Sequence, residues 1–215
     1  KDYKNKTVLI TASCTREPID KVRFISNYSS GKMGFALAGV AQARGARVIL
    51  ITGPTCLSTV KGIDTILINT AEEMKNEVFK YFKKADIIIS AAAVADFRPK
   101  EIFSGKIKKE ETKKMVIELE KTSDILYELG KKKGNKILVG FAAETENLVH
   151  NASKKLKEKN LDLIIANDLL AKGAGFGSDK NTAKIIDNKG IVRELPLMPK
   201  TDMAEKILDE ILKIN

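Results

Sequence analysis

The chain has 215 residues, a formal net charge of +10 and a hydrophobic content of 43%, which is enough for a packed core. No apolar run approaches the ~18 residues of a membrane-spanning helix, and two cysteines are too few for a disulfide scaffold. The charged start, KDYKNK, is not a signal peptide, so we expect a cytoplasmic protein with reduced thiols and no membrane contact. Acidic residues accompany the basic ones throughout, and we expect no nucleic-acid partner.

The first two elements are a β-branched, apolar strand over residues 6–12 and a helix over about 31–44. Between them lies the loop TREPIDKVRFISNYSSGKMG, residues 15–34. A strand-to-helix connection usually takes ~2–6 residues, and this longer one leaves the carboxyl end of a strand, where open α/β sheets bind ligands. Apolar residues such as Phe24 and Ile25 argue against a disordered insert. We therefore interpret the loop as a binding surface.

Three further strands are expected over residues 46–52, 63–70 and 85–93. Thr70 and Glu73 form a capping-box pattern for a helix that continues through residue 84. The strand over 85–93 is apolar throughout, as a central parallel strand should be. A second polar loop covers 94–111, and the strand after it, 114–119, has no helical crossover before it. We expect an arm over about 106–120 that leaves the main sheet.

The rest of the chain alternates helices over 123–133, 146–159 and 203–214 with strands over 136–143 and 161–168. A Gly-rich loop over 172–181 precedes a hairpin, about 181–195, that turns around Asn188 and Gly190. This alternation predicts an α/β fold: a doubly wound, Rossmann-like parallel sheet with an added antiparallel β-arm or hairpin. With no linker or repeat, we expect one domain over residues 1–215.

Several features favour an anionic ligand. The segment SSGKMG opens a helix, whose N–H groups and dipole attract phosphate, although it is neither a P-loop nor a dinucleotide fingerprint. Lys155 and Lys159 stand four residues apart, and Lys159 has no obvious carboxylate partner. Lys106, Lys108 and Lys109 lie in the second loop, where a lysine suits a reaction that develops negative charge. A solvated lysine surface explains both groups about as well.

Other chemistries have weaker support. Cys14 follows a strand, but the single histidine, His150, lies on a distant predicted helix, so a Cys–His pair would need an unproven contact. Zinc lacks enough soft ligands. The Y-x-x-x-K pattern of short-chain reductases occurs twice, at Tyr28 and at Tyr127, without the glycine fingerprint that holds NAD(P).

The motifs TREPIDKVRFISNYSSGKMG, AAAVADFRP, KIKK, GFAAET and LDLIIAND occur in this order across nearly the whole chain. In them the chain resembles the phosphopantothenoylcysteine synthetase family of the bacterial type. That family forms the C-terminal half of a bifunctional protein with a flavin-dependent decarboxylase, so we expect this chain to be part of a longer one. The resemblance implies a homodimeric ligase of coenzyme A biosynthesis. It would join 4′-phosphopantothenate to L-cysteine through an acyl-cytidylate, consuming CTP with Mg²⁺ and releasing pyrophosphate and CMP.

The resemblance also implies roles for single residues. Asn27 and Arg23 would handle the acyl-cytidylate, and Lys106 would stabilise the charge of the activation step. Asn27 would also bind phosphopantothenate, together with the backbone of Ala92 and Ala93. The family's metal ligands cannot be assigned by motif. The positions expected on the nucleotide or its phosphates are Ser13, Ser29, Gly31, Gly34, Asp96, Lys106, Ser123, Asp124, Ile125, Leu126, Phe141, Lys155, Lys159 and Asn167.

Two departures from the family pattern bear on this hypothesis. Ser13 and Cys14 stand where the family usually has glycines, and a side chain there could crowd the nucleotide or be absorbed by a shift. Ser123 replaces the usual proline of its segment. The alternatives that stay open are an NAD(P)-dependent short-chain-type reductase, a non-catalytic nucleotide-binding module and a ligase that uses ATP.

Overall fold

A central sheet organises the computed structural model, which describes residues 1–108, 114–144, 146–168, 173, 175 and 177–214. In this part of the chain the sheet has eight strands in the order β12-β11-β10-β9-β6-β1-β4-β5. Six neighbouring strands of this order are parallel: β10, β9, β6, β1, β4 and β5. The strands β11 and β12 are antiparallel at one edge. The strands are β1 (Thr7–Ala12), β4 (Arg47–Thr52), β5 (Asp64–Leu67), β6 (Ile87–Ser90), β9 (Ile137–Glu144), β10 (Leu163–Asp168), β11 (Lys180–Asp187) and β12 (Val192–Pro199).

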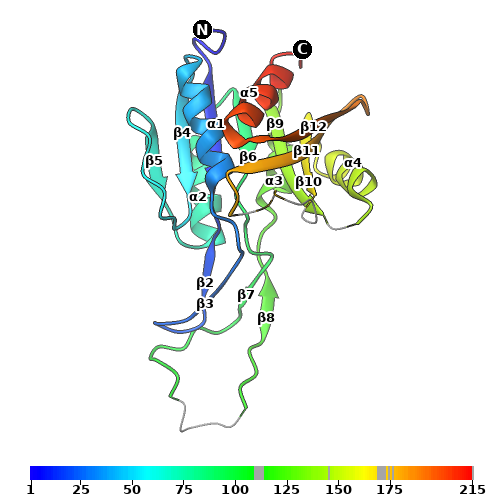
Figure 1. Ribbon diagram of the computed structural model, residues 1–215. Helices are drawn as coiled ribbons and strands as arrows, with labels where there is room; N and C mark the ends of the chain where they lie inside the picture. The colour runs from blue at the N-terminus through cyan, green and yellow to red at the C-terminus, as the bar shows by residue number, and fades with distance from the viewer. Residues whose placement is uncertain (109–113, 145, 169–172, 174, 176, 215) are drawn as a thin grey trace.

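Helices cover both faces of this sheet (Figure 1). The helices α1 (Lys32–Ala43) and α5 (Lys200–Ile211) pack on one face. The other face carries α2 (Ala71–Phe82), α3 (Ile125–Lys132) and α4 (Leu148–Glu158). Successive strand residues point to opposite faces, so in β1 Ile10 joins the first cluster and Leu9 the second. The doubly wound α/β fold is confirmed.

Two short hairpins extend below the sheet, at the end of the molecule opposite both termini (Figure 1). One pairs β2 (Arg16–Pro18) with β3 (Phe24–Ser26), within the first polar loop. The other pairs β7 (Phe97–Pro99) with β8 (Leu119–Lys121) and forms the base of the expected arm. The strand predicted over 114–119 is wrong over most of its length, because pairing begins at Leu119 and, in the part of the chain that the structure describes, residues 114–118 belong to no strand.

The remaining boundaries are close to those expected except in two strands, because β5 (Asp64–Leu67) and β6 (Ile87–Ser90) are shorter than the strands expected over residues 63–70 and 85–93. The C-terminal hairpin is longer than predicted, and it joins the main sheet through the pairing of β11 with β10. The helix α5 begins at Lys200 rather than at Met203. The capping box of α2 is present, because Thr70 Oγ1 accepts the Glu73 N–H and the Glu73 carboxylate accepts the Thr70 N–H. Among the helices described here, none has both the length and the apolar character needed to cross a membrane.

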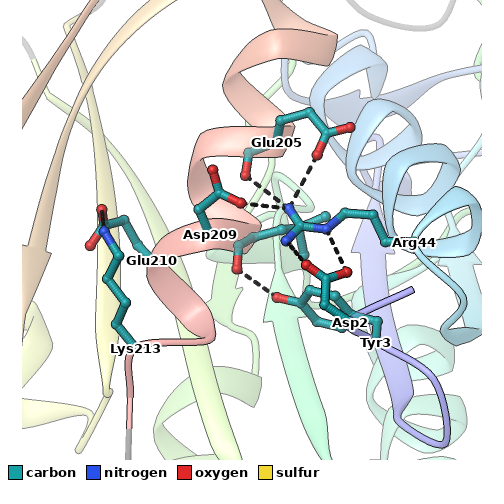
Figure 2. Close-up of polar contacts among 8 residues, drawn as sticks. Asp2, Tyr3, Arg44, Glu205, Asp209, Glu210 and Lys213 are labelled. Atoms are coloured by element: carbon teal, nitrogen blue, oxygen red, sulfur yellow. Dashed lines mark hydrogen bonds and ion pairs between the residues drawn. The ribbon is translucent and has the colours of Figure 1, made fainter.

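An arginine network connects the N-terminal segment with α1 and α5 (Figure 2). The Arg44 side chain is only 13% exposed and lies over the Tyr3 ring, 5.1 Å from its centroid. The Tyr3 hydroxyl donates to the Leu208 carbonyl at 2.7 Å. The guanidinium forms ion pairs with three carboxylates: Asp2, Glu205 at 3.1 Å and Asp209 at 2.9 Å. The network fixes both chain ends to the same face of the sheet.

Replacing Arg44 by Met should lower the free energy of unfolding by about 1–2 kcal/mol, because the half-exposed Asp2 and Asp209 side chains lose their common partner. The matched control is Arg47→Met, since Arg47 is 67% exposed and has a single long ion pair, 3.7 Å, with Asp64. That change should cost less than ~1 kcal/mol. Urea denaturation measures both values, and similar losses in the two variants would contradict the assigned role.

Candidate functional site

A pocket of about 400 Å³ lies at the carboxyl ends of the parallel strands. Its walls come from the segment after β1, the segment after β6 and the ends of β9 and β10. From β1 the chain proceeds to β4 and β5 in one direction, and β6 then returns to the other side of β1. Such a reversal of strand order opens a crevice where doubly wound proteins bind ligands.

Most of the predicted site residues line this pocket, although they come from distant parts of the chain. They lie on the first loop, on the segment after β6, on α3 and α4, and on β9 and β10. The predicted residues in its wall are Asn27, Ser29, Gly31, Gly34, Ala92, Ala93, Asp96, Ser123, Asp124, Ile125, Leu126, Phe141, Lys155, Lys159 and Asn167.

Three predicted residues do not line the pocket: Ser13, Arg23 and Lys106. Ser13 is fully buried, with φ of 64°, in the left-handed region where glycine is favoured. Its hydroxyl donates to the Pro54 carbonyl at 2.8 Å, so its side chain points to the 53–56 turn. Cys14 is also buried outside the pocket. The side chains of Ser13 and Cys14 are therefore buried in the protein, and neither lies in the wall of the pocket.

Two glycines allow α1 to begin close to β1. Gly31 has a φ of 82°, which a residue with a side chain adopts at a cost. A Cβ on Gly34 would lie 2.5 Å from the Ala12 Cβ, so only glycine fits there. The positive end of the α1 dipole consequently points into the pocket beside the sheet.

The segment after β6 is held against the first loop at Ala93. The Ala93 N–H donates to the Ser13 carbonyl at 2.8 Å, and the Ala93 carbonyl accepts from Thr15 N–H at 3.3 Å. The same carbonyl accepts from Asn27 Nδ2 at 3.1 Å, which places the Asn27 amide over the strand end. The Ala92 N–H is bonded to Thr11 Oγ1 at 3.2 Å. The two alanines thus offer small side chains to a ligand, whereas their N–H groups and the Ala93 carbonyl are already bonded.

The α3–α4 side of the pocket carries lysines that are paired with carboxylates. Lys155 contacts Glu144 at 2.7 Å. The expectation that Lys159 lacks a carboxylate is wrong, because its ammonium lies 2.8 Å from Asp124, the N-cap of α3. The partner belongs to a different helix, which a search along α4 cannot find. Both lysines are therefore held in place before a ligand arrives.

The predicted site residues leave out six polar residues of the wall: Ser30, Lys32, Ser90, Thr122, Asn181 and Lys200. Lys32 stands inside the SSGKMG segment, so its position could have suggested it. Asn181 is the last residue of the Gly-rich loop and Lys200 follows the C-terminal hairpin, and no local pattern marks either of them. Lys200 is 6% exposed, and burial, followed by the charge of Lys32, lowers the pKa of its ammonium group.

A buried carboxylate joins the two long loops. Asp20 accepts the N–H groups of Val22 and Arg23 at 2.7 Å, the N–H of Ile107 at 3.1 Å and the Arg23 guanidinium at 2.5 Å. Burial raises the pKa of Asp20, but these donors outweigh it and lower the pKa to about 2. Arg23 Nη1 also reaches the Ile107 carbonyl at 3.4 Å. Arg23 therefore supports the loop beside Lys106, whereas Lys109 lies outside the described residues.

Asp20→Asn should release the 100–108 segment and make both loops several-fold more sensitive to proteolysis, because the amide cannot accept all these N–H groups. In the wild-type chain a lowered carboxyl pKa stabilises the native loops above the unfolded value of ~3.9. That contribution should be lost as the pH falls from about 4 towards about 2. Limited proteolysis with an acid-stable protease measures the cleavage rate of both loops in the variant and, for the wild-type chain, as a function of pH. Asp64→Asn at an exposed site is the control. An unchanged cleavage pattern in Asp20→Asn would exclude this role.

Residues of the alternative chemistries lie mostly away from the pocket. Tyr28 is 94% exposed and Tyr127 is 41% exposed, and neither lines the pocket. Lys131 lies over the Tyr127 ring, 4.2 Å from its centroid, on the surface of α3. His150 is exposed on α4 and outside the pocket wall. The geometry therefore offers no reductase-like Tyr–Lys pair within this pocket.

Comparison with known proteins gives consistent matches over almost the whole chain. The family model "DNA/pantothenate metabolism flavoprotein C-terminal domain" matches residues 3–214. The Coenzyme A biosynthesis bifunctional protein CoaBC of Bacillus subtilis (strain 168) is 52% identical over 213 residues, 99% of this chain and 52% of that protein. The protein of the same name from Borreliella burgdorferi is 51% identical over 211 residues, 97% of this chain and 53% of that protein. The chain thus spans about half the length of these curated relatives.

A solved structure extends the likeness to three dimensions. The crystal structure of the C-terminal domain of Coenzyme A biosynthesis bifunctional protein CoaBC superposes with a TM-score of 0.84 at 43% identity. The match covers 98% of this chain and 95% of that one. The overall fold of this chain is therefore shared with that domain.

Proposed function

The chain belongs to the DNA/pantothenate metabolism flavoprotein C-terminal domain family, and from this premise we propose that it is a phosphopantothenate–cysteine ligase. It would join 4′-phosphopantothenate to L-cysteine in coenzyme A biosynthesis. The observation that carries the proposal is the pocket at the β1–β6 switch point, which gathers predicted site residues from the first loop, the segment after β6, α3, α4, β9 and β10. Relatives of about 50% identity that are named for coenzyme A biosynthesis support it.

The proposed reaction has two steps. The carboxylate of 4′-phosphopantothenate attacks the α-phosphorus of CTP, which forms an acyl-cytidylate and expels pyrophosphate. The amine of cysteine then attacks the acyl carbon, loses a proton and expels CMP. No protein nucleophile is needed, so the main tasks are to hold anionic reactants together and to offset developing charge. The lysines, the first turn of α1 and the Asn27 amide are the groups in the wall that suit these tasks.

The nucleotide would lie against the α3–α4 side of the pocket. Asp124 and Lys159 form one fixed pair there, and Glu144 and Lys155 form a second. Ser123 is also held, because its hydroxyl accepts from Lys75 at 3.0 Å. Phe141 and Leu126 supply apolar surface for a base. The acid substrate would lie beside Asn27, Ala92 and Ala93, where the carboxylate can meet the α-phosphate.

Magnesium fits this pocket as a metal carried by the nucleotide. The described residues contain no group of three or more His, Cys, Asp or Glu side chains that could hold a metal by themselves. Mg²⁺ is usually bound through one or two carboxylates together with substrate phosphates and water. Asp96 lies in the wall and has no ion-pair partner among the residues described, so it would supply the protein ligand. Bound Mg²⁺ would offset charge on the triphosphate.

We further propose a cytoplasmic homodimer, with this domain fused to a flavin-dependent decarboxylase domain in the complete protein. The arm and first loop expose many large apolar side chains, and a patch of this kind marks an interaction surface. The C-terminal hairpin is a second candidate contact. The exposed side chains of the arm and first loop include Val22, Phe24, Tyr28, Ile102, Phe103, Met115 and Val116.

Pyrophosphate release tests the proposed function. The chain is incubated with 4′-phosphopantothenate and Mg²⁺, with CTP or ATP, and with or without cysteine. Release with CTP, an acyl-cytidylate trapped without cysteine and CMP formed on adding cysteine are expected. Release with ATP but not with CTP would support the ligase activity and would show that the nucleotide substrate is ATP. Binding of CTP without pyrophosphate release would indicate a non-catalytic nucleotide-binding module, and stabilisation by NADPH alone would indicate a reductase.

A further inference from the structure

The connection between β8 and α3, residues 122–124, lies in the wall of the pocket and is held by several parts of the molecule. At its first residue, the Thr122 N–H donates to the Asp96 carbonyl at 3.0 Å. The Thr122 hydroxyl donates to the Ala95 carbonyl at 2.6 Å. These two bonds fix the start of the β8–α3 connection to the segment after β6.

The other end of the β8–α3 connection is fixed by α3 and α4. Asp124 is the N-cap of α3, and its Oδ1 accepts the Tyr127 N–H at 2.9 Å. Its Oδ2 lies 2.8 Å from the ammonium of Lys159, which follows α4. Between these two ends stands Ser123, outside any helix or strand. A serine leaves its φ free to vary, whereas a proline would fix it near about −65°.

Lys75 of α2 holds this middle residue from outside the pocket. Its ammonium donates to Ser123 Oγ at 3.0 Å and to Glu128 Oε1 at 2.7 Å. The side chains of Lys75 and Glu128 are 24% and 32% exposed, so solvent screens this ion pair less than a fully exposed one. Neither residue lines the pocket. Lys75 consequently ties the middle of the β8–α3 connection to both α2 and α3 without being part of the wall.

We propose that Lys75 is a positioning residue, which acts through Ser123 to hold the β8–α3 connection in the geometry that binds the nucleotide. The inference rests on the proposed function, because it takes the nucleotide to lie against the α3–α4 side of the pocket. A wall that is ordered before the ligand arrives loses less conformational entropy on binding, so the affinity rises. Glu128 takes part, because its carboxylate orients the Lys75 ammonium.

Calorimetry with Mg²⁺ tests this role through the Kd of two ligands, CTP and 4′-phosphopantothenate, with ATP in place of CTP if the wild-type chain binds only ATP. Lys75→Met should weaken nucleotide binding by about 5-fold, the loss expected when the backbone of one residue must be ordered on binding. The Kd of 4′-phosphopantothenate should stay unchanged, because that substrate would lie beside Asn27 and Ala93. An equal loss for both ligands would show a general destabilisation and would overturn the proposal.

Lys80→Met is the matched control. Lys80 lies on the same helix, α2, and has a carboxylate partner of its own, Glu77 at 3.1 Å. It lies outside the wall of the pocket. Its replacement removes the same charge and an ion pair of the same kind, so both Kd values should remain those of the wild-type chain. A nucleotide affinity that falls equally in Lys80→Met and Lys75→Met would reject a specific role of Lys75.

A double-mutant cycle tests whether Lys75 acts through Ser123. Once Ser123→Ala has removed the hydroxyl, Lys75 has lost its contact with the β8–α3 connection. The double variant Lys75→Met/Ser123→Ala should therefore bind CTP no more weakly than Ser123→Ala alone. If the two losses multiply instead, Lys75 acts independently of Ser123 and the proposal is rejected.

Ser123→Pro orders the same residue without the side-chain contact. Ser123 is not among the non-glycine residues with positive φ, and within the described residues its N–H donates no hydrogen bond, so proline meets neither obstacle. In this background, adding Lys75→Met should change the Kd of CTP by less than about 2-fold. A loss as large as in the wild-type background would contradict the proposal. If the proline variant does not fold, the cycle with Ser123→Ala decides the question.

Pyrophosphate release by the same proteins separates this proposal from the proposed function. If the wild-type chain releases pyrophosphate and Lys75→Met binds the nucleotide normally, the role of Lys75 is rejected and the ligase stands. If the wild-type chain releases none but Lys75→Met still shows the selective loss of nucleotide affinity, the ligase is rejected and the role of Lys75 stands. If the wild-type chain binds neither CTP nor ATP, both are rejected.

Discussion

Asn27→Asp is expected to slow conversion of the acyl-cytidylate to product by about 10²–10³-fold, the usual cost of removing one donor from a developing oxyanion. The Asn27 amide is fixed by its hydrogen bond to the Ala93 carbonyl at 3.1 Å, at the end of the strand where the acyl group would lie. An aspartate would also repel that carbonyl and the anionic reactants. Formation of the intermediate should suffer less than its conversion, because the missing donor acts on the acyl oxygen, which gains negative charge when cysteine attacks.

Single-turnover measurements test this prediction. Pyrophosphate release reports the first step, and CMP release after adding cysteine reports the second. The control is Asn188→Asp, which introduces the same charge at an exposed turn between β11 and β12, outside the pocket. Equal slowing of the two steps would contradict a specific role of Asn27 in the second step. Wild-type kinetics would contradict any role of Asn27 in the site.

The order of elements and the position of the pocket were predictable because local patterns determine them. Apolar runs predict strands, and the run over residues 85–93 contains β6 (Ile87–Ser90). The Thr70–Glu73 capping box marks a helix start that the structure contains. Carboxyl ends of parallel strands meet at one edge, so motifs that follow separate strands had to converge. The resemblance then selected residues that the pocket gathers, including Asn27 and Phe141.

What the sequence did not show depends on contacts between distant segments. The pairs Asp124–Lys159 and Glu144–Lys155 join separate elements, and no spacing rule predicts them. Lys200 enters the pocket because α5 packs beside α1, far along the chain. The β2–β3 hairpin has three-residue strands, which are too short to show alternation. Arg23 was expected to contact a ligand, but its guanidinium contacts Asp20 and Ile107 in this structure.

Lys106→Gln should slow pyrophosphate release by about 10²-fold or more, because the activation step adds charge around the α-phosphate. Lys106 is exposed on the arm segment beside Ile107 and lies outside the pocket of its own chain. In the proposed homodimer, we expect the arm of one chain to bring Lys106 to the pocket of the other. Lys100→Gln is the control, since Lys100 lies in the same connection between β7 and β8 and pairs with Glu118.

Mixing two inactive variants tests that arrangement directly. If the partner supplies Lys106, a dimer of Lys106→Gln with Asn27→Asp keeps one intact site, which combines Asn27 of one chain with Lys106 of the other. Random pairing of equal amounts makes half of the dimers mixed, so roughly a quarter of the wild-type activity should return. If each chain uses its own Lys106, both sites of the mixed dimer stay defective and no activity returns. Normal activity of the Lys106→Gln variant alone would show that Lys106 has no role in the reaction.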